Sequence, residues 1–222
     1  MYGHNKDTLL PPEAGSDADG LIALGFDVRG FVLSPPREVL YERIDRRVEA
    51  MAEGGLFEEA ASLAMRGVRS GSSNASRAVG YRQALELLEL GVDADVADIG
   101  AQQVQECVLS IMAATRRLAS SQLSWHRNDT LQWYWHSAED ETVSVAEDIV
   151  RVCSSPRDEP TAFDADLSRV TKEELQRLRR FPPQLEAFRD EASAEKLAER
   201  VRCLARAIKD GAPIPDSSAM EQ

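Results

Sequence analysis

Apolar residues recur at spacings of three and four over much of the chain, which is the period of an amphipathic helix. The longest such run predicts a helix over residues 95–124. Its buried stripe consists of Val104, Val108, Ile111, Thr115, Leu118 and Gln122. Thr115 and Gln122 are polar, so we expect each to need a hydrogen-bond partner in a buried position. Arg116 and Arg127 point in nearly the same direction on this helix and could form one basic edge. The bland alternative is a core helix with solvated arginines.

The same patterning predicts further elements, with punctuation by Gly, Pro, Asn and Ser. A β-rich stretch at residues 26–33 predicts a strand, and the aromatic stretch at residues 131–135 predicts an edge or terminal strand. Residues 66–75 lack periodicity and are rich in Gly and Ser, which indicates an exposed, mobile loop. The predicted helices besides the long one cover residues 37–53, a segment from Leu56, 76–90, 143–152, and segments near 171–180 and 193–208.

These elements divide the chain into three parts. Residues 1–24 are predicted to be an irregular leader, and residues 25–153 a mostly helical domain. Residues 154–222 begin with a charged linker and are predicted to continue as a small helical or partly disordered tail. The fold class expected from the pattern is mainly α with one or two short strands.

Composition excludes several classes of protein. No run of about 18 apolar residues occurs, so no membrane partner is expected. The net charge of −12 argues against broad electrostatic binding of nucleic acid and requires any such contact to come from a local basic patch. The three cysteines form no C-x-x-C pair, so neither a zinc module nor a disulfide framework is expected. No targeting signal is readable, which leaves a cytoplasmic or an organellar location open.

A cluster around Gly80 is the first candidate for chemistry. A glycine inside a helix pattern costs roughly 1 kcal/mol relative to alanine, which suggests close approach of a backbone or a ligand. Arg77, Tyr81, Arg82 and Gln83 surround it, and two arginines beside one glycine suit a phosphate or a diphosphate. The alternative is a glycine that eases helix packing, with exposed arginines around it.

Three blocks in this order carry a resemblance. They are P-x-R-E-x-L-Y-x-R-I-x-x-R-V-x-x-M-x-x-G-G-L-x-x-E, R-A-V-G-Y-R-Q, and T-R-R-L-A-x-x-Q-L-x-W-x-R followed by a Trp-containing strand. Over residues 26–136 they closely resemble the C-terminal half of the tRNA dimethylallyltransferases. That resemblance implies transfer of a dimethylallyl group from dimethylallyl diphosphate to N6 of the adenosine next to the anticodon. The target base is flipped out of its stack for this reaction.

The resemblance also implies roles for individual residues. Arg77 or Arg82 would contact the diphosphate, within a substrate-binding group that includes Gly80, Tyr81, Gln83 and Thr115. The residues expected to face the tRNA are Arg116, Gln122, Trp125 and Arg127. Trp125 could serve either as a stacking surface or as part of the core. Magnesium is implied as a cofactor, with ligands outside this chain, and the fold would be the C-terminal part of a P-loop NTPase-like α/β fold.

The chain departs from the family pattern in two ways. Ser120 and Ser121 stand where the family carries basic residues. The family's P-loop and its general-base aspartate lie in an N-terminal half that has no counterpart here: no lysine follows a glycine, and the one Asp-Ser pair is Asp216-Ser217. We therefore assign no catalytic residue and no metal ligand, and we expect these 222 residues alone to be inactive.

Three hypotheses follow from the resemblance and its gaps. The first is a dimethylallyltransferase homologue represented by its C-terminal half. The second is a non-catalytic tRNA-binding protein, or one that complements a separate N-terminal half. The third is a helical scaffold, such as the product of a truncated gene model, whose arginines are merely solvated.

Overall fold

The computed structural model describes most of the chain and is mainly helical. The described residues are 17–93, 96, 99–129, 133–137, 142–156, 171–186, 188 and 190–214. The elements are α1 (Asp17–Ala23), β1 (Gly30–Leu33), α2 (Arg37–Glu53), α3 (Leu56–Met65), the 3₁₀ turn η2 (Ala75–Arg77), α4 (Tyr81–Asp93), α5 (Ala101–Asn128), β2 (Trp133–His136), α6 (Thr142–Ser154), α7 (Lys172–Arg179) and α8 (Glu191–Asp210). The predicted mainly α chain with one or two short strands is confirmed.

The chain divides into two compact units. Unit 1 comprises residues 1–37 and 121–179, and unit 2 comprises residues 38–120 and 180–222. Helix α5 begins in unit 2 and ends in unit 1. Each unit therefore draws on segments that lie far apart in the sequence.

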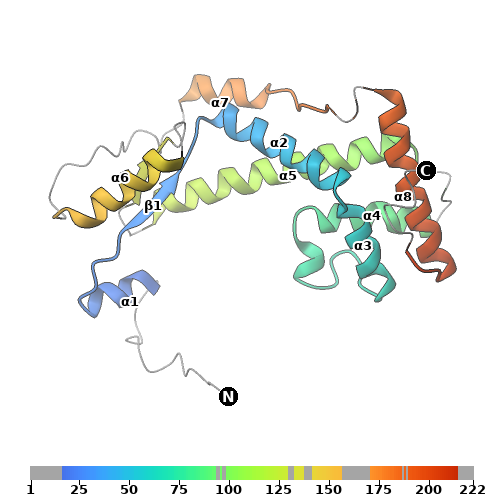
Figure 1. Ribbon diagram of the computed structural model, residues 1–222, viewed down its shortest axis with the longest axis horizontal. Coiled ribbons are helices and arrows are strands. Elements are labelled where there is room, and N and C mark those ends of the chain that lie inside the picture. Colours follow the sequence, from blue (N-terminus) through green and yellow to red (C-terminus); the bar gives the residue numbers. More distant parts are fainter. Residues whose placement is uncertain are drawn as a thin grey trace, which may run out of the picture. The chain divides into compact units, whose positions relative to one another are not determined.

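Unit 1 is built around two parallel strands, β1 and β2 (Figure 1). The register pairs Gly30 with Trp133 and Leu33 with His136. The rings of Phe31 and Tyr134 stack with their centroids 5.4 Å apart. Adjacent parallel strands are typical of α/β folds, in which helices cover the faces of the sheet. This pair agrees with a mainly helical piece of such a fold.

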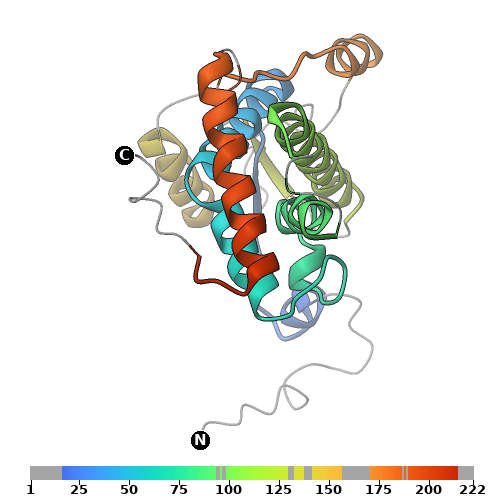
Figure 2. The ribbon, with the colours of Figure 1, turned by 90° about the vertical axis from the view of Figure 1, so that its right-hand side faces the viewer.

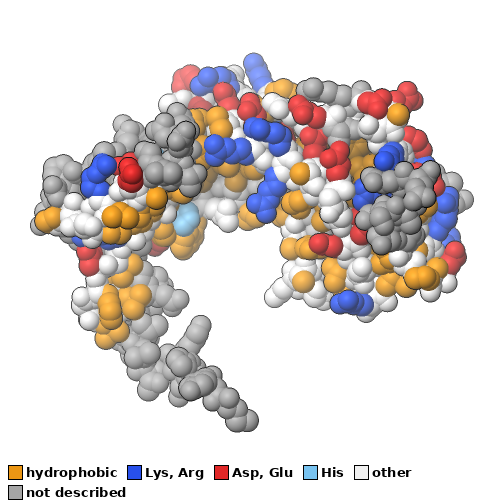
Figure 3. All heavy atoms as spheres, in the orientation of Figure 1, with side chains coloured by type: hydrophobic (Ala, Val, Ile, Leu, Met, Phe, Trp, Pro, Cys, Tyr) orange, Lys and Arg blue, Asp and Glu red, His pale blue; other side chains and the backbone are white. Residues whose placement is uncertain are grey.

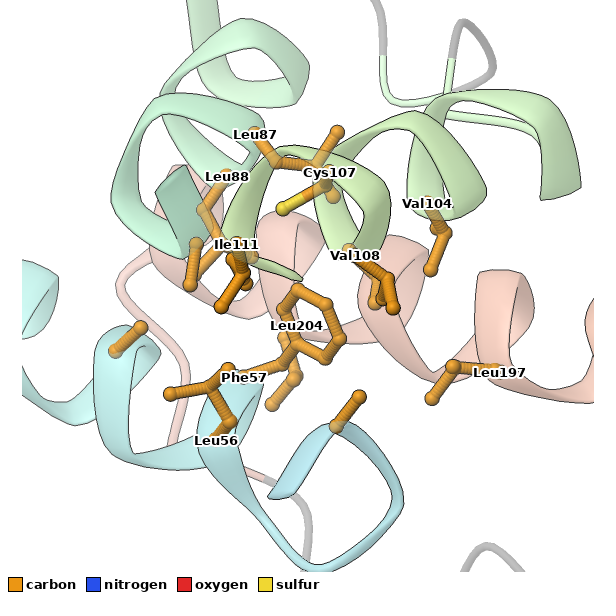
Figure 4. Close-up of a cluster of buried hydrophobic side chains, with 14 of the residues drawn as sticks. Leu56, Phe57, Leu87, Leu88, Val104, Cys107, Val108, Ile111, Leu197 and Leu204 are labelled. Carbon is orange, nitrogen blue, oxygen red and sulfur yellow. The ribbon is translucent and has the colours of Figure 1, made fainter. Parts of the chain in front are cut away.

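Unit 2 holds the main hydrophobic core. Buried residues of α2, α3, α4, α5 and α8 pack into one cluster, and the labelled side chains of α3, α4, α5 and α8 point toward one another in Figure 4. The largest fully buried members include Phe57, Leu85, Leu88, Ile111 and Leu204. Helix α8 lies against α3 and α4, as Figure 2 also shows.

Local sequence signals explain where the helices begin and end. Helix α2 begins at Arg37, directly after Ser34-Pro35-Pro36, and it ends before Gly54. Helix α8 begins after Asp190, whose carboxylate accepts hydrogen bonds from the backbone N–H groups of Ala192 and Ser193. It ends at Gly211, which has φ of 64° and closes the last turn in the left-handed conformation.

Three element boundaries differ from the sequence prediction. The predicted helix over residues 76–90 is an η2 turn followed by α4 from Tyr81, so Gly80 lies outside the helix. The long helix starts at Ala101 rather than near residue 95 and continues to Asn128. The leader, predicted to be irregular, forms helix α1 over Asp17–Ala23, while residues 1–16 lie outside the described part.

The C-terminal tail is also more ordered than expected. The predicted helices near residues 171–180 and 193–208 are confirmed as α7 and α8. The prediction treated this part of the chain as a small tail. Instead, one face of helix α8 is buried in the core of unit 2. The linker residues 157–170 lie outside the described part.

Candidate functional site

Gly80 immediately precedes helix α4 and has φ of +98°. A Cβ atom built there would lie 3.7 Å from Met51 Cε and 3.8 Å from Leu56 Cδ1, which is ordinary contact. Space therefore does not require glycine at this position, whereas the left-handed backbone does. The prediction of a glycine inside a helix is wrong, and the cause is an unrecognised helix start.

Gln83 caps the start of α4 through its side chain. Its Oε1 accepts a hydrogen bond of 3.0 Å from the backbone N–H of Gly80, as a glutamine at the third helical position does in a capping box. Only 4% of Gln83 is exposed. Its Nε2 is buried and has no hydrogen-bond partner among the described residues. Gln83 thus holds the turn with one end and presents an unused donor with the other.

Tyr81 links the start of α4 to helix α3. Its hydroxyl donates a hydrogen bond of 2.7 Å to Glu59 Oε2. This bond, with partial burial and the negative charge of Glu59, raises the pKa of Tyr81 above its ordinary value. Tyr81 is therefore a neutral hydrogen-bonding group at physiological pH.

Arg77 and Arg82 are both exposed and lie at either side of Gly80 in the sequence. The Nε of Arg77 donates to the carbonyl oxygen of Gly71 at 3.0 Å. Arg82 lies 4.0 Å from Glu86, and both side chains are about half exposed, so this ion pair is worth little. Both guanidinium groups keep donors that could meet an anion.

The loop at residues 66–75 is attached to α4 rather than free of it. The backbone N–H of Ser70 donates to Glu89 Oε1 at 2.8 Å, and its hydroxyl donates to Glu86 Oε1 at 3.3 Å. Arg77 reaches back to the same loop through Gly71. The structure thus brings together the loop and Arg77, Gly80, Tyr81, Arg82 and Gln83.

Thr115 is half-buried, and its hydroxyl is satisfied within its own helix. The Oγ1 atom donates a hydrogen bond of 2.8 Å to the carbonyl oxygen of Ile111, one turn earlier. The expectation that this hydroxyl finds a partner is confirmed. No hydrogen bond or ion pair among the described residues joins Thr115 to the residues at the start of α4.

Arg116 lies in a mostly buried ion pair with Asp45 of α2. The side chain of Arg116 is 13% exposed and that of Asp45 is fully buried, and the contact is bidentate. The guanidinium also lies over the rings of Tyr41 and Phe181, 4.7 and 5.3 Å from their centroids. The Asp45 carboxylate accepts a further hydrogen bond of 3.0 Å from the backbone N–H of Gln184. The sequence pattern did not single out Asp45. Its position beside the apolar Ile44 on the buried side of α2 could have indicated a buried acid that needs a cationic partner.

Gln122 is exposed, so the prediction that it belongs to the buried stripe is wrong. The buried side of α5 follows Val104, Val108 and Ile111, whereas Leu118 is 48% exposed. An amide in water needs no internal partner. Arg127 is exposed as well.

Trp125 is 60% exposed and belongs to an aromatic cluster at the end of α5. Its ring lies 4.8 Å from that of His126 and 6.3 Å from that of Trp133, centroid to centroid. Trp133 in turn donates from Nε1 to Asp129 at 3.0 Å. The structure excludes the core interpretation of Trp125 and leaves an exposed aromatic surface.

No metal centre is found within the described ranges. In that part of the chain no group of three or more His, Cys, Asp or Glu side chains could hold a metal ion. In the same part, no helix has both the length and the apolar character needed to cross a membrane.

Comparison with known proteins finds one family. The model of the family described as IPP transferase matches residues 9–129. The chain is 42% identical over 106 residues to a tRNA dimethylallyltransferase of Protochlamydia amoebophila, which covers 48% of this chain and 28% of that protein. It is 38% identical over 117 residues to a tRNA dimethylallyltransferase of Mycobacterium leprae, with coverage of 52% and 35%. The matched region thus spans about a third of these relatives. No solved structure matches.

Proposed function

Because the chain belongs to the IPP transferase family, we propose that it is the part of a tRNA dimethylallyltransferase that holds the leaving diphosphate and faces the RNA. One observation carries this proposal: the family match at residues 9–129 contains every candidate site residue. The reaction is attack of the adenosine N6 on the first carbon of dimethylallyl diphosphate, with departure of diphosphate and loss of a proton from the nitrogen. This chain would supply groups for the departing anion and for the RNA.

The start of α4 is the proposed diphosphate side. Arg77 and Arg82 keep guanidinium donors at the surface, and charge-assisted hydrogen bonds from arginine suit phosphate oxygens. The buried Nε2 of Gln83 is a further donor, and a donor without a partner is costly unless a ligand meets it. Donors placed where negative charge develops stabilise the transition state of group transfer.

The end of α5 is the proposed RNA side. The exposed ring of Trp125 gives a flat surface of the kind on which unpaired bases stack. Gln122 and Arg127 are exposed on the same helix and offer hydrogen bonds to RNA. Arg116 is held in the ion pair with Asp45, so its role would be to position α2 against α5.

Catalysis by these 222 residues alone is not part of the proposal. The sequence contains no P-loop, and no aspartate stands in the expected general-base motif. Loss of a general base costs roughly 10² to 10⁴ in rate. The missing groups, and the ligands for the Mg²⁺ that the resemblance implies, would come from a polypeptide that corresponds to the N-terminal part of the relatives.

A transfer assay tests this proposal. The purified chain is mixed with labelled dimethylallyl diphosphate and an anticodon stem-loop that carries the target adenosine. The assay is run with and without the preceding part of the Protochlamydia amoebophila relative as a separate polypeptide. We expect no transfer by the chain alone and transfer by the mixture. Transfer by the chain alone would refute the requirement for a second part, and an inactive mixture would refute the transferase assignment.

A second function is a tRNA-binding protein without catalysis. The observation that favours it is the exposed Trp125 cluster in a chain that lacks the general-base motif. A gel shift with the anticodon stem-loop at modest salt distinguishes the two functions. If the chain alone shifts the RNA while the two-part mixture transfers no dimethylallyl group, the chain is an RNA-binding protein without catalysis.

A further inference from the structure

We propose that the exposed face of helix α2 is a docking face for the phosphate backbone of RNA, formed by Arg43, Arg46 and Arg47. This inference rests on the proposed function, because it takes tRNA as the partner. It assigns the phosphate contacts to residues other than Arg116, which the resemblance would place at the RNA.

Helix α2 divides its charged residues between two sides. Asp45 is fully buried and Glu49 is 6% exposed, so two of its acids face inward. The exposed positions of α2 are Arg43, Arg46, Arg47, Ala50 and Glu53. At about 100° per residue, the first four lie within about 100° of arc. Three arginines thus occupy one exposed face over a single turn of helix.

These arginines have no internal role that would explain them. Within the described ranges, none of the three forms an ion pair or a hydrogen bond. By contrast, Arg116 and Arg200 of the same unit are held by Asp45 and Glu58. Glu42 lies on the flank of the face and is half-buried. In Figure 3, Lys and Arg side chains gather in the region of α2.

Charge complementarity decides what this face fits. The chain carries a net charge of −12, so most of its surface repels any anionic partner, RNA included, and a phosphate backbone must be held by a local basic patch. A local set of three unpaired arginines is the kind of patch that an acidic protein needs to hold a phosphate backbone. Arginine binds phosphate oxygens through two parallel N–H groups, and successive phosphates of one strand can meet residues one turn apart. Arginine is common in this chain, with 22 arginines and only 4 lysines. The α2 face is therefore distinguished by the grouping of its arginines on one exposed side, and not by the presence of arginine as such.

The test is binding of the full chain to a fluorescently labelled anticodon stem-loop between 50 and 200 mM salt. The triple variant R43Q/R46Q/R47Q removes the face, and R43K/R46K/R47K keeps its charge. The matched control K196Q/R206Q/K209Q removes three positive charges from exposed positions of helix α8 in the same unit. Circular dichroism melts check that all variants remain folded, as expected for exposed side chains.

We expect the triple Gln variant to bind RNA at least roughly tenfold more weakly at 0.1 M salt. The slope of log affinity against log salt should fall by about one for each arginine that contacts phosphate, so by two to three in all. The Lys variant should keep most of the affinity and the slope, and the control should match the wild type. Wild-type affinity and slope in the triple Gln variant, an equal loss in the control, or no RNA binding by the wild type would overturn the inference.

The outcomes for α2 and for the proposed function can be told apart. Transfer by the two-part mixture, together with a triple Gln variant that binds RNA normally, would leave the transferase proposal standing without this face. An inactive mixture together with the expected loss in the triple Gln variant would leave an RNA-binding protein that uses this face.

Discussion

At the scale of single residues, the mostly buried ion pair between Arg116 and Asp45 is the contact whose loss we expect to affect stability strongly. Taking two charges out of water is costly, and the pair offsets that cost through bidentate hydrogen bonds, the backbone N–H of Gln184 and two aromatic rings. Removing one partner leaves the other charge mostly buried. The pair joins α2, α5 and the segment after α7, all within unit 2.

Replacing Asp45 by asparagine should therefore lower the free energy of unfolding by about 3 kcal/mol, because Arg116 keeps its charge without its counterion. Urea unfolding followed by circular dichroism measures the change. The control Arg117→Gln, at an exposed position next in sequence, should stay within about 0.5 kcal/mol of the wild type. A neutral Asp45→Asn variant would mean that the pair does not form in solution.

Gly80 permits a second test at this scale. Its φ of +98° strains any residue that has a Cβ, so Gly80→Ala should lower the free energy of unfolding by about 1 to 2 kcal/mol. Asparagine tolerates the left-handed region better, and Gly80→Asn should cost less. Equal losses for Ala and Asn would point to crowding against Met51 and Leu56 instead of backbone strain.

Cys107 should resist modification while the protein is folded. Burial raises the pKa of its thiol from 9 to about 12, so the reactive thiolate is absent at neutral pH. Because the folded state favours the neutral thiol, its contribution to stability is complete below about pH 9 and declines as the pH rises toward 12. A thiol reagent at pH 8 should modify the exposed Cys153 quickly and Cys107 only after unfolding. Fast modification of Cys107 in the native protein would contradict the placement of α5.

At the scale of elements, α8 shows how the C-terminal part joins the core. Its buried face contributes Leu197, Val201 and Leu204 against α3 and α4. Gly91 of α4 permits this close approach, since a Cβ there would lie 3.1 Å from the Cβ of Ala205 and 2.4 Å from Ile99 Cδ1. Helix α8 lies outside the family match at residues 9–129, yet it completes the core of unit 2.

Truncation of Leu204 to alanine should thus cost about 2 to 5 kcal/mol, the range for emptying a fully buried leucine site. Arg206→Ala, on the exposed side of the same helix, serves as the control and should cost far less. Thermal melts of both variants measure the difference. If Leu204→Ala were neutral, α8 would not be docked in solution.

At the scale of the molecule, exposed apolar side chains concentrate in unit 1. Parallel sheets are normally covered by helices on both faces. In the described part of the chain, the sheet of unit 1 consists of the two strands β1 and β2. The large exposed apolar residues of unit 1 are Leu21, Ile22, Leu24, Phe26, Leu33, Trp125 and Val150. A second polypeptide that supplies the remaining family fold would cover part of this surface.

We expect the chain alone to bind the dye ANS, because unit 1 exposes several large apolar side chains. Addition of the complementing part of the Protochlamydia amoebophila relative should reduce the dye fluorescence. ANS carries a sulfonate group that can also pair with the arginines of α2, so R43Q/R46Q/R47Q serves as the control for ionic dye binding and should keep most of the wild-type fluorescence. Unchanged fluorescence on mixing would mean that the two parts do not meet through unit 1.

The sequence by itself determined the helical class, the short strands and the location of most elements, because these depend on local periodicity and on Gly and Pro punctuation. It also determined the family, through three motif blocks whose order is independent of packing. Only the tertiary structure decided that Gly80 immediately precedes a helix, that Gln122 is exposed and that Arg116 is mostly buried. Each of these depends on residues distant in sequence: Asp45 lies 71 positions before Arg116, and no local pattern reports which side chain neutralises it. The same reason explains the burial of α8, because its partner helices α3 and α4 end 98 or more residues before it begins.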